Sequence, residues 1–247
     1  QKLLNKNIVI SAAADGIGWS IAQYCMNNGA NVYLSDINIE KLSLLKNHKN
    51  YNQTLFLEKV KTNDPESVLN YSLELKDNIS SIDCLINNVG ISGPTGKIED
   101  LKIDEWKNTI DININSHFYF SKYFIPLMKK NGGSIINLSS TAGLFGFPLR
   151  SPYAASKWAI IGLTKSLAME LGKFNIRVNA VCPGSVSGDR MKRVIEAKAT
   201  SMGLSEKTLQ RDFESMTSLN TFVDKEDISN SVIFLLSDEA KKISGQV

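Results

Sequence analysis

Short apolar segments typical of strands alternate with helix-like segments along most of this 247-residue chain. The first unit runs from an apolar stretch at 7–11, through a glycine turn and a helix at about 17–28, to a strand at 31–35. A helix between two such strands carries the chain back across a sheet, so the strands run parallel. Because the strands are mostly apolar, both faces of the sheet must be covered.

The same alternation continues to the end of the chain. We predict further strands at 54–60, 84–87, 134–138 and 177–182, and helices at 39–46, 65–79, 104–129, 153–171 and 227–236. Residues 185–221 interrupt the rhythm with an amphipathic stretch containing Met191, Val194 and Ile195, which we interpret as a helical flap over a substrate site. We therefore predict one α/β domain over residues 1–247, a Rossmann-like doubly wound parallel sheet with helices on both faces.

Composition excludes several other classes of protein. The chain has 28 basic and 25 acidic residues, a net charge of only +3, and its basic residues are scattered, so we expect no nucleic-acid partner. Cys25, Cys84 and Cys182 are widely separated, which favours reduced thiols, and with His48 and His117 they show no metal-ligand spacing. No apolar stretch approaches the roughly 18 residues that cross a bilayer, and the first residues do not resemble a signal peptide. We expect a cytoplasmic protein without a bound metal or a membrane partner.

Tyr153 and Lys157 stand four residues apart in Ser-Pro-Tyr-Ala-Ala-Ser-Lys-Trp-Ala, within a predicted helix. Residues at this spacing share one helix face, so the phenol has an ammonium group as its neighbour. A nearby positive charge favours the phenolate, and a tenfold increase in acidity corresponds to about 1.36 kcal/mol. A tyrosine in this setting can transfer protons near neutral pH. Because Tyr and Lys often occur at this separation, the surrounding motifs decide what the pair means.

Two of these motifs lie at the ends of predicted strands. Ser140 closes the run Ser-Ile-Ile-Asn-Leu-Ser-Ser thirteen residues before Tyr153, and the first strand leads into Ala-Asp-Gly-Ile-Gly. In this order, the motifs resemble those of the short-chain dehydrogenase/reductase family from about Asn5 to the last residue. Members of that family usually continue through a final strand, so we expect that both ends of the protein, including the closing strand, lie outside this sequence.

The resemblance implies a catalytic group of Asn113, Ser140, Tyr153 and Lys157. Ser140 would hydrogen-bond the substrate oxygen, and Tyr153 would accept its proton in oxidation or donate one in reduction. Lys157 would bind the nicotinamide ribose and lower the pKa of Tyr153. Asn113 would kink its helix and hold a water that relays the proton outward. The thirteen-residue interval selects Ser140 over Ser139, whereas the choice of Asn113 over Asn115 depends only on the residues that follow.

The resemblance also implies a dinucleotide cofactor. Gly16 and Gly18 would let the backbone approach a pyrophosphate at a helix N-terminus. Asp36 ends the second strand, where an acidic side chain accepts hydrogen bonds from the adenine ribose and repels a 2′-phosphate, so NAD is favoured over NADP. An alternative is that Asp36 only caps the helix after Asn38. The full cofactor-binding set is Ser11, Asp15, Gly16, Ile17, Gly18, Asp36, Asn88, Val89, Gly90, Tyr153, Lys157, Pro183, Gly184 and Val186.

Three residues depart from the family pattern. Ala12 replaces the first glycine of the turn and, if φ is positive there, adds strain of about 1–2 kcal/mol. Lys61 stands where an aspartate commonly accepts a bond from the adenine, so we expect it to turn to solvent. Gly188 stands where a threonine commonly holds the nicotinamide carboxamide. A catalytically silent nucleotide-binding protein is therefore an alternative function.

We expect an NAD-dependent oxidoreductase that interconverts a secondary alcohol and a ketone on a small polar or hydroxy-acid-like substrate. A 3-oxoacyl carrier-protein reductase is the alternative enzyme, and the resemblance implies a homotetramer. Four basic residues raise the hypothesis of an anionic substrate, because arginine binds a carboxylate bidentately; they are Arg150, Arg190, Lys192 and Arg193. The same residues could instead form the solvated face of a helix.

Overall fold

A computed structural model describes all residues from 1 to 247. Its sheet has six strands, all parallel, in the spatial order β3-β2-β1-β4-β5-β6. The strands are β1 (Asn7–Ser11), β2 (Asn31–Asp36), β3 (Leu55–Lys59), β4 (Cys84–Asn87), β5 (Gly133–Leu138) and β6 (Ile176–Val181). The prediction of a Rossmann-like doubly wound parallel sheet is confirmed. Between β1 and β4 the strand order reverses, and such a switch point is where open α/β sheets bind ligands.

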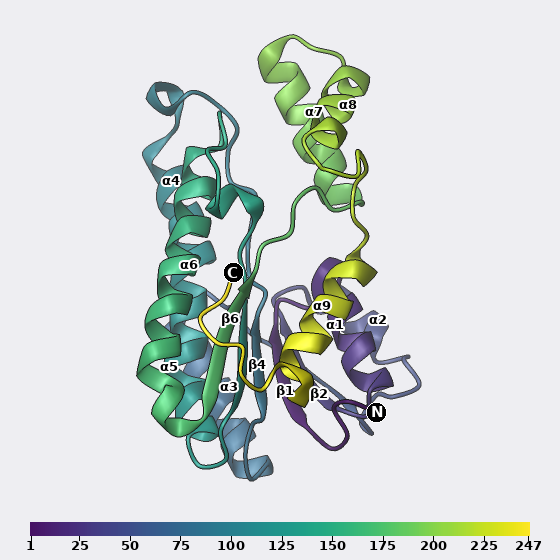
Figure 1. Ribbon diagram of the computed structural model, residues 1–247, viewed down its shortest axis with the longest axis vertical. Coiled ribbons are helices and arrows are strands. Elements are labelled where there is room, and N and C mark those ends of the chain that lie inside the picture. The colour runs from purple at the N-terminus through teal and green to yellow at the C-terminus, as the bar shows by residue number, and fades with distance from the viewer.

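Helices cover both faces of the sheet, as Figure 1 shows. They are α1 (Gly16–Asn27), α2 (Ile39–Leu45), α3 (Pro65–Asn78), α4 (Ile103–Ile110), α5 (Ser116–Met128), α6 (Ser151–Leu171), α7 (Asp189–Met202), α8 (Glu206–Ser215) and α9 (Lys225–Leu236). Local capping fixes several helix starts. The Asn38 side chain caps α2, Asp64 caps α3 just before Pro65, and Asp224 and Asp227 form a capping box on α9.

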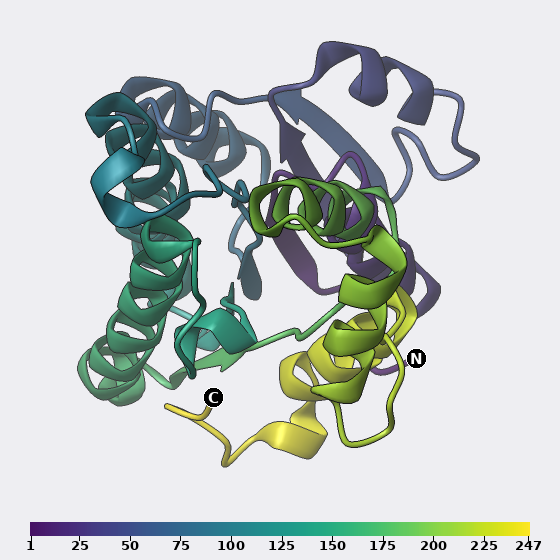
Figure 2. The same cartoon turned by 90° about the horizontal axis from the view of Figure 1, so that it is seen from above.

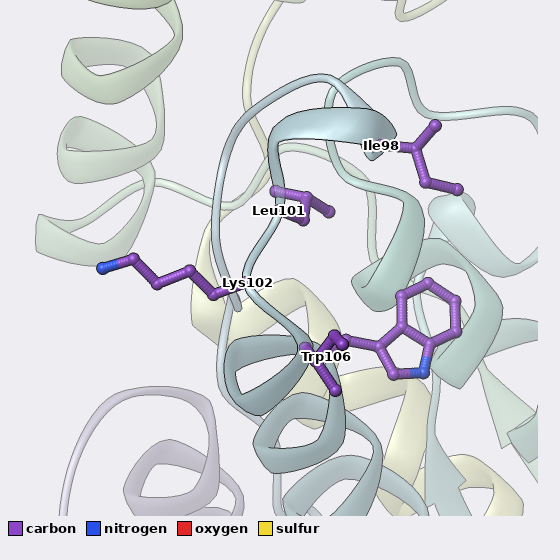
Figure 3. A pocket seen from close by; sticks show the side chains of 5 residues that line it. Ile98, Leu101, Lys102 and Trp106 are labelled. Carbon is purple, nitrogen blue, oxygen red and sulfur yellow. The ribbon is translucent and has the colours of Figure 1, made fainter.

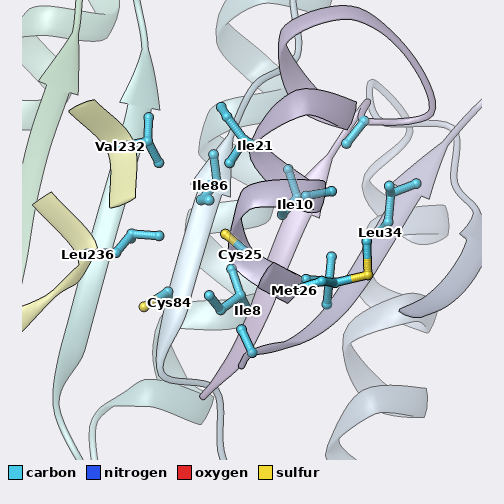
Figure 4. Packing of buried hydrophobic residues seen from close by; sticks show 14 of the residues in the cluster. Ile8, Ile10, Ile21, Cys25, Met26, Leu34, Cys84, Ile86, Val232 and Leu236 are labelled. Atoms are coloured by element: carbon cyan, nitrogen blue, oxygen red, sulfur yellow. The ribbon is translucent and has the colours of Figure 1, made fainter. Parts of the chain in front are cut away.

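Side chains that alternate along each strand build a separate core on each face. In β1, Ile8 and Ile10 pack with α1 and α9 on one face, and Val9 packs with α3 and α5 on the other. Figure 4 shows the first of these cores, where Cys25 and Val232 approach the strands from the two helices. Since a strand with both faces buried needs apolar residues at every position, this arrangement explains the nearly continuous apolar runs of the sequence.

The segment predicted as one helix over 104–129 is not a continuous α-helix. It consists of α4, a π-helical turn at Asp111–Asn115, and α5. Inside the turn, Asn113 is fully buried and bonds to the backbone of Ile91 in the loop after β4. This long-range pairing accounts for the local departure from α-helical geometry, and such turns are frequent at functional sites.

Helices α7 and α8 lie beyond the carboxyl ends of the strands, where the flap was predicted (Figures 1 and 2). Ile195 and Ala199 of α7 pack with Leu209 and Phe213 of α8 in a small core of their own. The backbones of Ser185 and Ser187 pair with Val223, which joins the two ends of this segment at its base.

The last residues run beside β6 at the edge of the sheet. The Gly245 N–H donates to the Val178 carbonyl (2.7 Å), and the Ala180 N–H donates to the Gln246 carbonyl (2.9 Å). None of the helices combines the length and the apolar character of a transmembrane span.

Candidate active site

The glycine turn between β1 and α1 holds Ala12 in a left-handed conformation, with φ of +51°. Gly16 is also left-handed (φ +59°), and a Cβ atom there would have no other atom within 4 Å. The turn therefore leaves an open approach to the backbone at the start of α1, where free N–H groups attract an anion. Asp15 caps this helix and forms an ion pair with Lys41, and Ile17 packs on the core beneath.

Gly18 is required for close packing rather than for an open approach. A Cβ atom there would lie 2.5 Å from Asn88 Nδ2 and 2.7 Å from Ala13 Cα. Asn88 fills this space because its side chain donates to the carbonyl of Ala12 (2.8 Å) and its backbone N–H donates to Ser11 Oγ (3.1 Å). Asn88 and Ser11 thus fix the shape of the glycine turn from below.

The carboxylate of Asp36 reaches back to the same turn. Its Oδ2 accepts from the Ala14 N–H (3.0 Å), and its Oδ1 accepts from the Asn38 N–H (2.9 Å). The side chain of Asn38 makes the capping bond of α2, to the Lys41 N–H. Each Asp36 oxygen retains acceptor capacity, since a carboxylate accepts about four hydrogen bonds. Asp36 therefore lies against the glycine turn, and its carboxylate can accept hydrogen bonds beyond those from Ala14 and Asn38.

The loop after β4 lies beside the second half of the site. His117 of α5 supports it from below, with Nε2 3.1 Å from the Val89 carbonyl. Gly90 lies against Lys157, because a Cβ atom on Gly90 would be 3.2 Å from Lys157 Nζ. Asn113 Oδ1 accepts from the Ile91 N–H (2.8 Å). These contacts bring Gly90 next to both Asn113 and Lys157, and Val89 next to His117.

Tyr153 and Lys157 lie on the first turns of α6 and meet across one helical turn, with Lys157 Nζ 5.7 Å from the centre of the Tyr153 ring. Only 4% of Lys157 is exposed, and its ammonium donates to the Leu138 carbonyl (2.9 Å). Ser139 and Ser140 have different partners. Ser139 Oγ donates to the Lys157 carbonyl (2.8 Å), whereas Ser140 Oγ caps the 3₁₀ turn Thr141–Gly143.

Charges around Tyr153 determine its acidity. Burial alone would raise the pKa of Tyr153, but Lys157, Arg190, a hydrogen bond with Ser140, and Arg150 together bring it below the usual value of 10. Burial lowers the pKa of Lys157, and the Tyr153 phenolate counteracts that effect. A phenol in this environment can exchange a proton at lower pH than a free tyrosine.

Asn113 belongs to this cluster and Asn115 does not. The Asn113 amide donates to the Ile91 carbonyl (3.0 Å) and to Ser156 Oγ (3.0 Å), so it ties the loop after β4 to α6. Asn115 bonds to Asp111 within its own turn. These bonds use both amide donors of Asn113 and one of the two lone pairs on its oxygen.

The segment after β6 completes the open side of the site. The Pro183 carbonyl accepts from the Thr141 N–H (3.0 Å), which places Pro183 and Gly184 beside the turn that follows Ser140. The bridge to Val223 uses the Ser185 carbonyl and the Ser187 N–H. In a strand, neighbouring backbone groups point to opposite sides, so the N–H and carbonyl of Val186 face away from Val223.

Two of the three residues that depart from the family pattern, Lys61 and Gly188, have surroundings that fit their side chains. Lys61 is exposed, and no hydrogen bond involves its ammonium group. Gly188 has φ of +133°, with open space around it, and precedes α7. A threonine at this φ would be strained, so the change to glycine belongs to the local backbone of the flap.

Two buried residues that we did not predict also belong to the site. His117 lies beneath the loop after β4, and Lys198 of α7 is only 8% exposed, with its ammonium 4.7 Å from the centre of the Phe147 ring. A signal for Lys198 was present, since it follows Arg190 by two helical steps of four residues and shares its helix face. The signal for His117 was weaker, because only the apolar residues around it indicate burial.

A hollow of about 200 Å³ lies outside this site, at the start of α4 (Figure 3). Four of its five lining residues are apolar, and Lys102 is its only ionisable group. It is lined by Ile98, Leu101, Lys102, Ile103 and Trp106. Its polar side-chain groups are the Lys102 ammonium and the Trp106 indole N–H, which do not form an acid–base or nucleophile–base pair.

Comparisons with known proteins extend over nearly the whole chain. The family model described as enoyl-(acyl carrier protein) reductase matches residues 12–247. The chain is 36% identical to trans-4-hydroxycyclohexanecarboxylate dehydrogenase of Sinomonas cyclohexanicum, over 99% of this chain and 91% of that protein. It is 33% identical to a 3-oxoacyl-(acyl-carrier-protein) reductase of Thermotoga maritima, over 100% of this chain and 96% of that protein.

A solved structure gives the same result in three dimensions. The crystal structure of NAD⁺-bound xylitol dehydrogenase has a TM-score of 0.94 at 27% identity, and the match covers 100% of this chain and 97% of that chain. Sequence, fold and motifs agree. The chain belongs to the short-chain dehydrogenase/reductase family of oxidoreductases.

Proposed function

We propose that the protein is an NAD-dependent dehydrogenase that interconverts a secondary alcohol and a ketone on a small polar or hydroxy-acid-like substrate. The observation that carries this proposal is the setting of Tyr153. Its phenol lies beside Lys157 and Ser140, and the charges around it hold its pKa below the usual value. Proton transfer to and from a substrate oxygen needs a group of this kind.

In the oxidising direction, Tyr153 as phenolate accepts the proton of the substrate hydroxyl. In the reducing direction, the protonated phenol donates to the oxygen of the ketone. Ser140 donates a hydrogen bond to the same oxygen and stabilises the charge that develops on it. When it is bound, the nicotinamide cofactor supplies the hydride chemistry.

Lys157 and Asn113 support these two residues. Lys157 favours the phenolate through its charge, and its ammonium is available to a ribose hydroxyl beside Gly90. Asn113 acts as a positioning residue that holds the loop after β4 against α6. In this proposal its backbone in the π-helical turn holds the water that carries the proton outward.

The cofactor proposal is NAD rather than NADP. Asp36 supports it, because a carboxylate at the end of β2 accepts from ribose hydroxyls and repels a phosphate. Asp15 and Ile37 provide no positive charge to counter that repulsion. The open space at Gly16 fits a pyrophosphate at the start of α1. The likeness to an NAD⁺-bound xylitol dehydrogenase agrees with this choice.

The substrate proposal is supported by the relatives and by the flap. One relative acts, by its name, on a hydroxycyclohexane carboxylate. Phe147 lies near Tyr153 and also contacts Phe213 of α8, so α7 and α8 are positioned to cover a small substrate. Residues 185–221 form this flap within a single catalytic domain.

A 3-oxoacyl carrier-protein reductase is the second candidate, favoured by the 33% identity to such an enzyme. Asp36 argues against it, since that reaction usually draws on NADPH. A comparison of NADH with NADPH on an acetoacetyl thioester separates the two enzymes. The silent nucleotide-binding alternative requires that NAD⁺ binds without turnover.

The protein is also proposed to form a homotetramer through α5 and α6. Both helices carry large apolar side chains that are exposed in the single chain, among them Phe118, Trp158 and Met169. Exposed apolar area of this kind is typical of an interface between subunits. Light scattering after gel filtration measures the mass directly.

A screen of alcohols and hydroxy acids for NADH absorbance tests the catalytic proposal, with Tyr153→Phe as the control. We expect turnover in the wild type and its loss in the variant, because phenylalanine preserves the packing but removes the proton carrier. Calorimetric titration with NAD⁺ checks that the variant still binds the cofactor. Turnover that survives Tyr153→Phe would contradict the mechanism.

A further inference from the structure

Three basic side chains from different parts of the chain converge beside Tyr153. The guanidinium carbon of Arg150 lies 5.3 Å from the centre of the Tyr153 ring, and that of Arg190 lies 5.8 Å from it. The ammonium of Lys198 lies on the neighbouring ring of Phe147, over which Arg150 is also placed. The first residue precedes α6 and the other two belong to α7.

Arg150 is buried without a counter-ion. Only 2% of it is exposed, yet it makes a single hydrogen bond, from Nη2 to the Ser92 carbonyl, and its buried Nε has no partner. A guanidinium carries five N–H donors. All four ion pairs of the protein lie elsewhere and involve lysines only. A buried charge without a partner is costly, so proteins keep one where it meets a ligand or a counter-ion.

Arg190 faces Arg150 from the flap. Its Nη1 donates to the Gly90 carbonyl (3.2 Å), so it bends from α7 across to the loop after β4. Arg150 is anchored two residues further along the same loop, at Ser92. Both anchors are neutral carbonyls, so neither compensates the charge. The other two basic residues of the hypothesis differ, because no hydrogen bond joins Lys192 or Arg193 to this loop and Lys192 pairs with Asp189 on its own helix.

The missing counter-ion is most simply an acidic group of the substrate. We infer that Arg150 and Arg190 bind a carboxylate of the substrate beside the Tyr153 hydroxyl, and that the substrate is a small hydroxy acid or the corresponding oxo acid. Arginine suits this task because its planar donors match a carboxylate bidentately. Lys198 adds positive charge behind Phe147. This inference rests on the proposed function, since it names the substrate of the same site.

The same distances limit the size of the substrate. Both guanidinium carbons lie near the ring that would exchange the proton, so the carboxylate and the reacting carbon are separated by only a few bonds. A neutral thioester on a long carrier arm would leave Arg150 buried and unpaired. The charge arrangement therefore favours a free hydroxy acid over an acyl thioester.

The test compares acids with their neutral esters. The probes are 2-hydroxybutanoate, 3-hydroxybutanoate and 4-hydroxycyclohexanecarboxylate, each paired with its methyl ester and assayed with NAD⁺. The test variant is Arg190→Gln, which removes an exposed side chain and leaves the core intact. Arg193→Gln is the matched control, since it removes the same charge from an exposed position on the same helix. Arg150→Lys retains the buried charge without the bidentate geometry and gives a second test.

We expect Arg190→Gln and Arg150→Lys to lower the pH-independent kcat/KM for an acid, measured above the rise of each profile, by at least about 30-fold, while the same quantity for its ester changes by less than about threefold. Arg193→Gln should leave both unchanged. Equal turnover of acid and ester by the wild type, or equal losses in the variants, would overturn the inference while the dehydrogenase proposal stands.

A binding measurement keeps the two proposals separate. If the wild type oxidises none of the probes, calorimetry with 3-oxobutanoate in the presence of NAD⁺ decides the question of the anion. Carboxylate binding that is present in the wild type and in Arg193→Gln but lost in Arg190→Gln supports the inference even then. Absence of binding in the wild type overturns it.

Discussion

His117 should make the folded protein sensitive to acid. The side chain is fully buried beneath the loop after β4, where Nε2 contacts the Val89 carbonyl and Nδ1 has no partner. Burial lowers its pKa to about 3, and the neighbouring positive charge of Lys157 contributes to this lowering. The imidazole is therefore neutral in the folded state throughout the range in which an exposed histidine becomes charged.

The size of the effect follows from the two pKa values. Below about pH 6.5 the unfolded chain binds a proton that the folded chain does not, so the free energy of unfolding falls as the pH falls. The loss is about 1.36 kcal/mol per pH unit until the pH reaches the folded value of about 3. At pH 5 the loss from this one residue is about 2 kcal/mol, a sizeable part of a typical stability of about 5–15 kcal/mol.

Urea unfolding at pH 7 and pH 5 measures this loss in the wild type and in His117→Gln. Glutamine cannot titrate, and its amide can still donate to the Val89 carbonyl. We expect the wild type to lose about 2 kcal/mol more than the variant between the two pH values. His48→Gln removes the other histidine and serves as the control. Losses in the wild type and in His117→Gln that agree within about 0.5 kcal/mol would refute the argument.

Further predictions concern the glycine turn, α6 and the catalytic tyrosine. Ala12→Gly should raise the free energy of unfolding by about 0.5–1 kcal/mol in urea titrations, because relief of the left-handed strain exceeds the entropy cost of glycine. Gly18→Ala should lower it by about 1–3 kcal/mol and weaken NAD⁺ binding in calorimetry, since its Cβ clashes with backbone. A Cβ atom added at Gly162 would have no other atom within 4 Å, so Gly162→Ala should instead stabilise α6 by about 0.5–1 kcal/mol. Arg190→Gln removes a charge that lowers the pKa of Tyr153, so the rise of kcat/KM for alcohol oxidation should move to higher pH; an unchanged profile would count against this role.

The order of elements could be predicted because most strands are buried on both faces. Ile8, Val9 and Ile10 all needed to be apolar, and that requirement is visible in one sequence. The position of β1 between β2 and β4 could not be predicted in this way, because no local sequence pattern records which strands pair. The expectation for it came from the motif resemblance and from the general rules of doubly wound sheets.

The π-helical turn could not be predicted from periodicity. Five residues of π-helix change the spacing too little to alter the apolar pattern of a long helix. Its cause is the contact between Asn113 and the backbone of Ile91, which are 22 positions apart. The kink expected at Asn113 came from the family resemblance, and only the three-dimensional structure gives its form.

The sequence also could not show which basic residues of the flap reach the site. In the sequence, Arg190, Lys192 and Arg193 are equivalent, and a solvated helix face explains all of them equally well. The direction of α7 decides between them, since it brings Arg190 to the Gly90 carbonyl, whereas no hydrogen bond joins Lys192 or Arg193 to that loop. That direction is set by the packing of α7 on α8, which depends on contacts such as Ile195 with Phe213.

The charges around Tyr153 link substrate binding to proton transfer. Arg150 and Arg190 both lower the pKa of the phenol, and in the proposed complex both lie beside a carboxylate. A bound carboxylate cancels part of their field, so the two arginines lower the pKa of the phenol less once an acidic substrate is present. Lys157 is then the cation that continues to hold the pKa down, because its ammonium is buried against Leu138 and Gly90. The lysine would therefore carry the catalytic part of the electrostatics, and the two arginines the recognition part.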